Sequence, residues 1–385
     1  MSATEPSSEP KKPRSLASYL VLPLLLIAVG VGLYRYLQTA EPAAPPMDTS
    51  KILNGYVKDA ERFSKLNYPD ADGDLVADLV ADAREPAELL FMEIPTNSVE
   101  EVEKIWTPFL AHMSAATGKP CKYLRVIDRP SSPAPAKADT DADDKTGKGD
   151  QVPEGGLTIR TFDTQLTALR EGYLHITAFT TGQVPIAVNT AGFVPMVAPA
   201  DKDNRFYYRF EVLVGANSPI KSVSELKGGV LGVSSLSSTS SAKAPFVVFY
   251  DEFKLHPRRD YQIRLPGDYR QTLGELTSNK ITAMCIASDL LAREVAAKRI
   301  SPDQYKSIYQ SKEFPKLCFG ASHQLPPSLI EKIRTGFTTF QFEGNSVGEK
   351  YRADGAVKFH PINYKSDWEV VRQVDARLVE ILQQE

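Results

Sequence analysis

Short apolar runs alternate with amphipathic segments along most of this chain, and this alternation restricts its fold more than any other feature. The runs 89–94, 174–179 and 281–286 have the length of buried strands, and helical patterns separate them. Strands buried on both faces are continuously apolar, and the helices between them cover the sheet. We therefore expect an α/β protein with mostly parallel sheets covered on both faces.

The composition excludes several classes of protein. The chain has 385 residues, enough for two lobes with sizeable cores, and its net charge of −3 does not indicate nucleic-acid binding. Its three cysteines cannot form a disulfide scaffold. Cys121, Cys285 and Cys318 lie in apolar runs without metal-ligand spacing, so we expect buried free thiols.

An uncharged run covers Ser15 to Tyr34 and is long enough for one membrane-spanning helix. Lys11, Lys12 and Arg14 precede the run, and the first charge after it is Arg35. Positive charge on the N-terminal side favours a cytoplasmic N-terminus and an exported body. We expect an uncleaved anchor on the outer, periplasmic face of the cytoplasmic membrane; a cleaved signal peptide is the alternative.

Two low-complexity segments, a proline-rich linker over Ala40–Met47 and the stretch 129–156, and two strand-to-strand connections predict the division of the chain. The stretch 129–156 has no aromatic residue and cannot bury enough apolar surface to order itself, so it is predicted to be a disordered insertion. The connections near 199–207 and 312–316 are the expected hinge crossings. The predicted units are 1–40, cytoplasmic tip and anchor; 41–86, linker and small acidic N-terminal segment; 87–200 plus 315–385, lobe I; and 201–314, lobe II.

A hydroxyl-rich loop follows the predicted strand 229–233 and leads into a helix. It contains Ser238, Thr239 and Ser240. The free N–H groups and positive dipole of a helix N-terminus attract anions, and hydroxyl groups add donors. We expect these three residues to hold the anionic end of a ligand. The alternative is a solvated serine-rich turn in which one serine caps the helix.

The residues around this loop resemble the phosphate- and phosphonate-binding periplasmic proteins of ABC transporters. The resemblance rests on Ser218 and Ile220, on the block Ser222–Gly228 and on Ser238-Thr239-Ser240. Weaker likenesses extend it over 87–385; they lie at Pro95-Thr96, Trp106–Phe109, Thr117-Gly118, Thr167–Gly172 and Phe179–Gly182. The resemblance implies a two-lobed type II binding-protein fold with a central ligand cleft, here preceded by the N-terminal transmembrane helix.

The chain departs from the family pattern at positions that determine ligand choice. Ser241 replaces a glycine after the Ser-Thr-Ser motif, and Ser235-Leu236 replaces an Asp-Pro. Tyr269 stands where the family has a histidine, and Ile186 replaces an expected aromatic residue. The resemblance therefore implies the fold more strongly than the ligand.

Three further residues are candidates for ligand binding. Tyr269 could donate its phenolic hydrogen to an anion, or merely cover the cleft. Asp289, at a helix start, either caps that helix or accepts a hydrogen bond from a protonated oxygen or an amine of the ligand. Thr96 follows the first strand and could reach the cleft from lobe I.

An acidic loop is a weak candidate for calcium. Asp70, Asp72, Asp74 and Asp78 occupy positions 1, 3, 5 and 9 of a calcium-loop pattern. The glycine expected at position 6 is Leu75, and no glutamate follows at position 12. A solvated acidic turn is the favoured interpretation, and no cofactor is otherwise expected.

These features together predict a solute-binding protein. It would capture a small oxyanion such as a phosphonate, phosphate or phosphite and deliver it to an ABC permease. The alternative is a membrane-anchored sensor or partner-recruiting module on the same fold without transport. An enzyme is not expected, because no nucleophile–base pair, P-loop or G-x-S-x-G motif occurs. The ligand itself and the oligomeric state do not follow from the sequence.

Overall fold

The structure is a computed structural model that describes residues 53–54, 57, 64–83, 85–93, 99–124, 126–128, 156–158, 161–257 and 259–384. The predicted membrane helix over 15–34, the proline-rich linker and nearly all of the insertion 129–156 lie outside these ranges. No helix within them combines the length and apolar character needed to cross a bilayer. Residues 48–385 form one compact unit, whose described parts are considered below.

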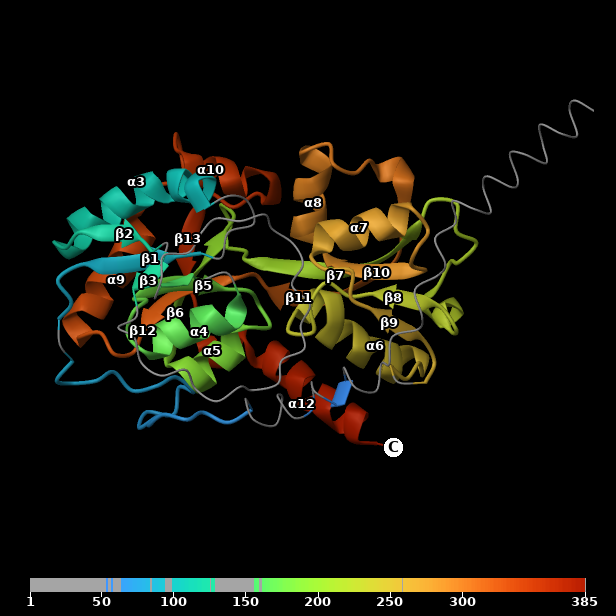
Figure 1. Cartoon of the computed structure of the whole chain (residues 1–385), viewed down its shortest axis with the longest axis horizontal. Helices are drawn as coiled ribbons and strands as arrows, with labels where there is room; N and C mark the ends of the chain where they lie inside the picture. Colours follow the sequence, from blue (N-terminus) through green and yellow to red (C-terminus); the bar gives the residue numbers. More distant parts are fainter. Residues whose placement is uncertain are drawn as a thin grey trace, which may run out of the picture. The chain divides into compact units, whose positions relative to one another are not determined.

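Sheet I is a six-stranded mixed sheet with the strand order β13-β6-β12-β5-β1-β2 (Figure 1). β1 runs parallel to β2 and β5, whereas β12 and β13 run antiparallel to their neighbours. We call this sheet and the helices around it the sheet I half. Its strands are β1 (Leu89–Met92), β2 (Cys121–Tyr123), β5 (Ile176–Phe179), β6 (Phe193–Ala200), β12 (Cys318–Ser322) and β13 (Lys358–Pro361). Its helices are α3 (Val99–Thr117), α4 (Phe162–Arg170), α5 (Val184–Ala191), α9 (Pro327–Thr339), α10 (Ser346–Tyr351) and α11 (Tyr364–Asp367).

An aromatic core fixes α3 on sheet I. Trp106 and Phe109 of α3 are fully buried and lie on one helical face. Their rings pack against Phe91 of β1, at centroid distances of 4.9 and 5.3 Å. Phe319 of β12 stacks on the same ring at 6.5 Å. Burying several aromatic side chains of this size contributes most of the stability of such a half.

Sheet II has five strands in the order β11-β7-β10-β8-β9. β8 runs parallel to β9 and β10, and β7 runs antiparallel to β10 and β11. With its helices it forms the sheet II half (Figure 1). The strands are β7 (Tyr207–Gly215), β8 (Val230–Gly232), β9 (Gln262–Arg264), β10 (Ala283–Ala287) and β11 (Tyr305–Pro315); the helices are α6 (Ala244–Phe253), α7 (Tyr269–Thr277), α8 (Ser288–Ala296) and the short turns η1 (Val223–Leu226), η2 (Thr239–Lys243) and η3 (Pro302–Gln304). A separate antiparallel pair joins β3 (Val126–Asp128) to β4 (Gly156–Thr158), and η4 (Arg352–Asp354) follows α10.

Two short connections carry the chain between the sheets. One joins the end of β6 at Ala200 to the start of β7, and the other joins the end of β11 at Pro315 to β12. The connections are tied together where the Lys316 amide donates to the Phe206 carbonyl at 2.7 Å. The expectation of mostly parallel sheets was wrong, because the strands that carry these connections run antiparallel in their sheets.

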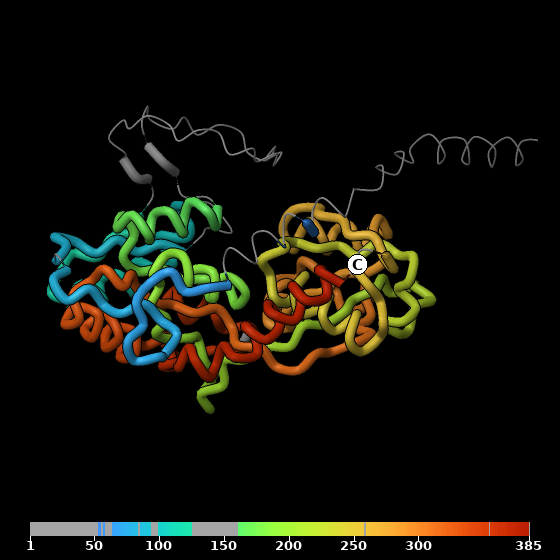
Figure 2. The backbone as a smooth tube through the Cα atoms, turned by 90° about the horizontal axis from the view of Figure 1, so that it is seen from below, coloured from blue at the N-terminus to red at the C-terminus, as the bar shows by residue number. Residues whose placement is uncertain are grey.

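The C-terminal helix α12 (Glu369–Gln383) links the two halves. It follows the sheet I half in the chain and runs to the sheet II half, where it packs on α6 and η2 (Figure 2). Its buried residues include Val371, Leu378 and Ile381, spaced for one helical face. The helix therefore contacts both halves, α11 in the sheet I half and α6 and η2 in the sheet II half.

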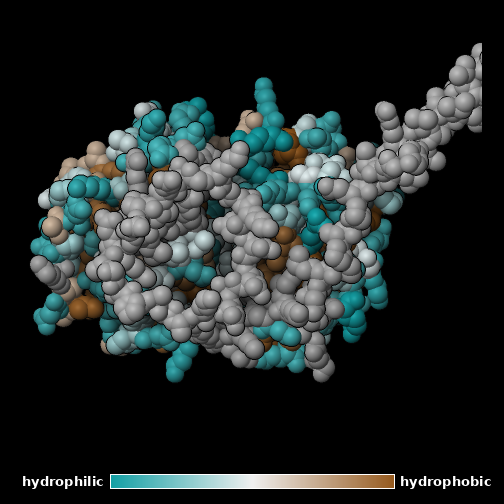
Figure 3. Space-filling view, viewed as in Figure 1, coloured by the Kyte–Doolittle hydropathy of each residue, from teal (hydrophilic) through white to brown (hydrophobic). Residues whose placement is uncertain are grey.

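The outer surface of the described residues is mostly polar. In the part of Figure 3 that is coloured, hydrophilic residues prevail at the rim of the molecule and apolar residues form small separate areas. The exposed large apolar side chains are Leu75, Val80, Tyr207 and Val357. Scattered exposed apolar residues of this kind are normal for a surface that faces water.

Candidate functional site

The serine-rich loop begins where β8 ends and continues into η2, a single π-helical turn that precedes α6. Ser238 caps this turn, because its hydroxyl accepts from the Ser241 amide at 3.1 Å. The next three residues are buried rather than solvated, with Thr239 only 2% exposed. One serine therefore caps the helical turn, as in the alternative interpretation, but Thr239, Ser240 and Ser241 are buried and do not form the solvated turn of that alternative.

Thr239 has an unusual environment for a hydroxyl residue. Its Oγ1 atom is buried and has no hydrogen-bond partner among the described residues. The neighbouring Ser240 hydroxyl is 3.4 Å from that of Ser238. A buried hydroxyl without a partner costs about 1–3 kcal/mol, so such a group is retained where a ligand or water completes it.

Tyr208 of β7 brings further polar groups to the loop. Burial raises the pKa of the Tyr208 hydroxyl, the carboxylate of Asp289 raises it further, and the hydroxyls of Thr181, Ser240 and Thr239 lower it. These groups come from β7, α8, η2 and the turn after β5. The structure thus gathers four hydroxyls and one carboxylate, which we call the hydroxyl cluster: Thr181, Tyr208, Thr239, Ser240 and Asp289.

Thr181 joins the cluster from the sheet I half. It lies directly after β5, and its hydroxyl donates to the Pro315 carbonyl at 2.7 Å. Its own carbonyl accepts from the indole N–H of Trp368 at 3.1 Å. Both partners are buried, so the turn that carries Thr181 is held in one position. Ligands of open α/β sheets bind beyond the carboxyl ends of the strands, and this turn lies there.

Asp289 lies in the first turn of α8 but is not its cap. The N-cap position is Ala287, which has no side chain capable of capping. The Asp289 carboxylate lies 3.7 Å from the Arg293 guanidinium, and its Oδ1 atom is buried without a hydrogen-bond partner in the described part of the chain. The capping alternative that the sequence left open for Asp289 was therefore wrong. A buried carboxylate oxygen in this position is free to accept a hydrogen bond.

The other two residues predicted to bind the ligand, Tyr269 and Thr96, are not part of the hydroxyl cluster as the structure describes it. Tyr269 begins α7, and its hydroxyl donates to Glu294 at 3.1 Å, so the structure gives this hydroxyl a partner outside the cluster. Thr96 lies outside the described residues. Sequence analysis missed Thr181 and Tyr208. The sequence features that could have indicated them are the position of Thr181 just after a predicted strand and the two adjacent tyrosines at 207 and 208. The structure buries Tyr208 and leaves Tyr207 exposed.

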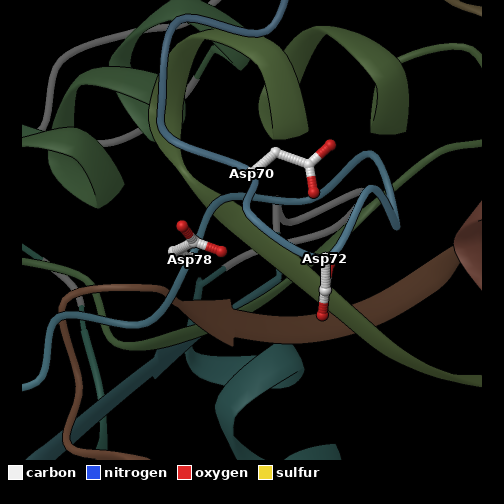
Figure 4. A group of neighbouring side chains, drawn as sticks. All are labelled: Asp70, Asp72 and Asp78. Atoms are coloured by element: carbon white, nitrogen blue, oxygen red, sulfur yellow. The ribbon is translucent and has the colours of Figure 1, made fainter.

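The acidic loop brings three of its four aspartates together. Potential ligand atoms of Asp70, Asp72 and Asp78 all lie within 4.8 Å of one another (Figure 4). Burial, followed by the neighbouring carboxylates, raises the pKa of Asp74, which is not in this group. The carboxylates already accept hydrogen bonds from amides of their own loop, among them Asp74 N to Asp70 at 3.1 Å and Ala71 N to Asp78 at 3.1 Å. The loop's own hydrogen bonds thus account for the clustering.

The three cysteines are buried and free, as the sequence predicted. Burial raises the pKa of Cys121 to about 12 and also raises the pKa values of Cys285 and Cys318. A reactive cysteine requires a shift in the opposite direction, because the thiolate is the nucleophile. These thiols therefore contribute to packing.

Solved structures of similar fold come from several bacteria. PhnD1 from Prochlorococcus marinus, solved with methylphosphonate, has 13% identity and a TM-score of 0.57, covering 76% of this chain and 99% of its own. XAC2383 from Xanthomonas citri, bound to ATP, has 12% identity and a TM-score of 0.57, covering 77% and 99%. A binding-protein component of an ABC phosphonate transporter from Pseudomonas aeruginosa has 16% identity and a TM-score of 0.53, covering 76% and 86%. At these identities the likeness shows the fold alone: a two-sheet α/β periplasmic binding protein.

The comparison with protein families, unlike the comparison of folds, assigns the sequence to a family. No curated protein matches the chain. The family model described as "ABC transporter, phosphonate, periplasmic substrate-binding protein" matches residues 155–365, more than half of the chain. This region contains the whole hydroxyl cluster. The chain belongs to the periplasmic substrate-binding proteins of phosphonate ABC transporters.

Proposed function

We propose that this protein captures a small phosphonate or related oxyanion, such as phosphate or phosphite, in the hydroxyl cluster and delivers it to an ABC permease. The observation that carries the proposal is the buried hydroxyl of Thr239 at the start of η2, which lies beside the Tyr208 hydroxyl but makes no hydrogen bond of good geometry with the described residues. An anion that enters a protein loses hydration and needs replacement hydrogen bonds. Hydroxyls and helix N–H groups supply them without a counter-charge.

The cluster also suggests the protonation state of the ligand. Ser238 lies beside the cluster, and its hydroxyl accepts from the Ser241 amide, so it can donate its own hydrogen to Ser240 or to an anion. Asp289 can only accept while it is ionised, and its Oδ1 atom is unpartnered. A ligand that fits both has anionic oxygens facing the hydroxyls and one donor facing Asp289. A singly protonated phosphonate or an aminoalkylphosphonate meets this requirement.

The first test removes hydroxyls from the loop. The double variant Ser238→Ala/Thr239→Ala should bind methylphosphonate at least a hundredfold more weakly by isothermal titration calorimetry. Each hydrogen bond to a charged group is worth roughly 1.5–3 kcal/mol, and ~1.4 kcal/mol corresponds to tenfold in affinity. Its melting temperature should fall by only a few degrees, because the lost Ser238 cap contributes about 1 kcal/mol and the variant adds no charge or bulk.

The matched control removes two hydroxyls elsewhere. Ser307 and Thr335 are exposed, and the double variant Ser307→Ala/Thr335→Ala should bind as the unaltered protein does. Inorganic phosphate and an alkylsulfonate serve as further probes of ligand class. Equal affinity of the loop variant and the unaltered protein for methylphosphonate would refute the anion role of the loop.

The second part of the proposal is that residues 1–40 anchor the protein to the outer face of the cytoplasmic membrane. It is supported by the uncharged run from Ser15 to Tyr34 and by the positive charges that precede it. The full chain should sediment with membranes, whereas a chain that begins at residue 41 should remain in the supernatant. Recovery of both in the supernatant, with the N-terminus of the full chain intact, would contradict the anchor.

A further inference from the structure

Lys243, the last residue of η2, is a buried cation whose partners lie outside the sheet II half. Its side chain is about 3% exposed. Its Nζ atom donates to the Gly182 carbonyl at 2.9 Å and lies 2.9 Å from Asp375 Oδ1. A buried ammonium group is strongly destabilising without partners. The sheet II half therefore needs Gly182 and α12 to stabilise this charge.

Gly182 also brings the backbone of the sheet I half close to the backbone of the loop. A Cβ atom at this position would lie 2.3 Å from the Ser237 carbonyl oxygen and 2.9 Å from the Thr239 amide nitrogen. Real Cβ contacts are not that short, and both atoms belong to backbone, which cannot rotate away. Only glycine allows the Thr181-Gly182 turn to touch the ligand loop in this way.

Helix α12 supplies Asp375, the second partner of Lys243, and is itself fixed to both halves. Its first turn is fixed on the sheet I half, because the adjoining Trp368 donates to the Thr181 carbonyl. Its middle carries Asp375, which pairs with Lys243. Further along, Arg377 binds Asp251 of α6 at 2.7 Å. The helix thus places a carboxylate directly behind the loop that begins at Ser238.

We propose that Gly182, Lys243 and Asp375 form a latch that holds the ligand loop against the Thr181-Gly182 turn and so sets how readily the site closes. The latch acts on positioning, since none of its side chains belongs to the hydroxyl cluster. Lys243 ends the same turn that Thr239 begins, and Gly182 adjoins Thr181. Closing the latch therefore brings hydroxyls from both halves together before a ligand arrives. Apparent affinity falls in proportion to the fraction of protein in the binding-competent state.

The steric test uses Gly182→Ala in the full chain. The added methyl group should separate the turn from the loop. Amide hydrogen exchange without ligand should then be at least tenfold faster in peptides covering 180–184 and 238–244. The control is Gly274→Ala in α7, where an added Cβ atom meets nothing within 4 Å, and exchange in these peptides should not change.

The charge test uses Asp375→Asn, which is nearly isosteric and preserves folding. It should accelerate exchange in the same two peptides, because Lys243 is left buried with a weaker partner. The control Asp251→Asn weakens the half-buried Asp251–Arg377 pair between α6 and α12 but leaves the partners of Lys243 in place, so exchange in the two peptides should change much less. Unchanged exchange in both Gly182→Ala and Asp375→Asn would overturn the latch.

Affinity for methylphosphonate gives a second readout that rests on the proposed function. Gly182→Ala should weaken binding at least tenfold, but its added Cβ atom also lies 2.7 Å from the Thr239 hydroxyl of the cluster. Asp375→Asn changes no group of the hydroxyl cluster, so a loss of affinity in that variant reports the latch alone. If the unaltered protein bound no methylphosphonate, phosphate or phosphite, the proposed ligand class would fail, while the exchange measurements would still decide whether the latch exists.

Discussion

At the scale of single residues, the structure shows which polar groups are satisfied within the fold and which remain available. His175 belongs to the first kind. Its Nδ1 atom accepts from the Leu90 amide at 3.0 Å, which ties the start of β5 to β1. Burial lowers the pKa of His175 to about 4, although Glu88 opposes this effect. The ring is therefore neutral at physiological pH, and protonation would break this contact.

His175 gives the protein a pH-dependent stability with a definite sign. Between pH 6.5 and about 4 the unfolded chain takes up a proton that the folded protein does not, so stability falls as the pH falls. The full loss is up to roughly 3 kcal/mol, from ~1.4 kcal/mol per unit of pKa. The variant His175→Asn retains an acceptor but does not titrate. Its urea midpoint should fall less between pH 7 and pH 4.5 than that of the unaltered protein; equal falls would contradict the assignment.

At the scale of elements, local patterns predicted the helices and buried strands well. The helix expected after the serine-rich loop is present as η2 and α6. The strand β11 was missed because it is an edge strand with many exposed polar residues. The helix α5 was missed because it contains Pro185, which is tolerated in the first turn of a helix.

The π-helical form of η2 could not be predicted from the sequence. The Lys243 and Ala242 amides both donate to the Ser238 carbonyl, at 3.1 and 3.2 Å. A serine-rich helix start is compatible with an ordinary α-turn as well. The wider turn lets Lys243 reach Gly182 and Asp375, which are contacts of the tertiary structure.

At the scale of the whole molecule, the two sheets share one apolar core. The main hydrophobic cluster includes Phe91 of sheet I and Phe210 of sheet II, and α12 packs on both halves. Two chain connections and the latch add further links. The halves should therefore unfold together rather than one after the other.

Differential scanning calorimetry can test this coupling. The full chain should show a single main transition, because the shared core loses most of its buried apolar area when either half unfolds. Two well-separated transitions of similar enthalpy would contradict a shared core. The variant Asp375→Asn should lower the temperature of the single transition without dividing it.

The sequence by itself determined the α/β class, the family resemblance and the loop that begins at Ser238, because strand length, helix spacing and capping depend on neighbouring residues. The tertiary structure alone decided which residues meet that loop. Thr181 and Tyr208 come from other segments and meet Thr239 only because the end of β5 and the starts of β7 and η2 lie at one place in the fold. Likewise, a lysine in a serine-rich loop predicts a solvated charge, and only the packing of α12 shows that Asp375 and Gly182 bury it. Contacts between distant segments follow from how the sheets and helices pack, and local sequence patterns do not encode that packing.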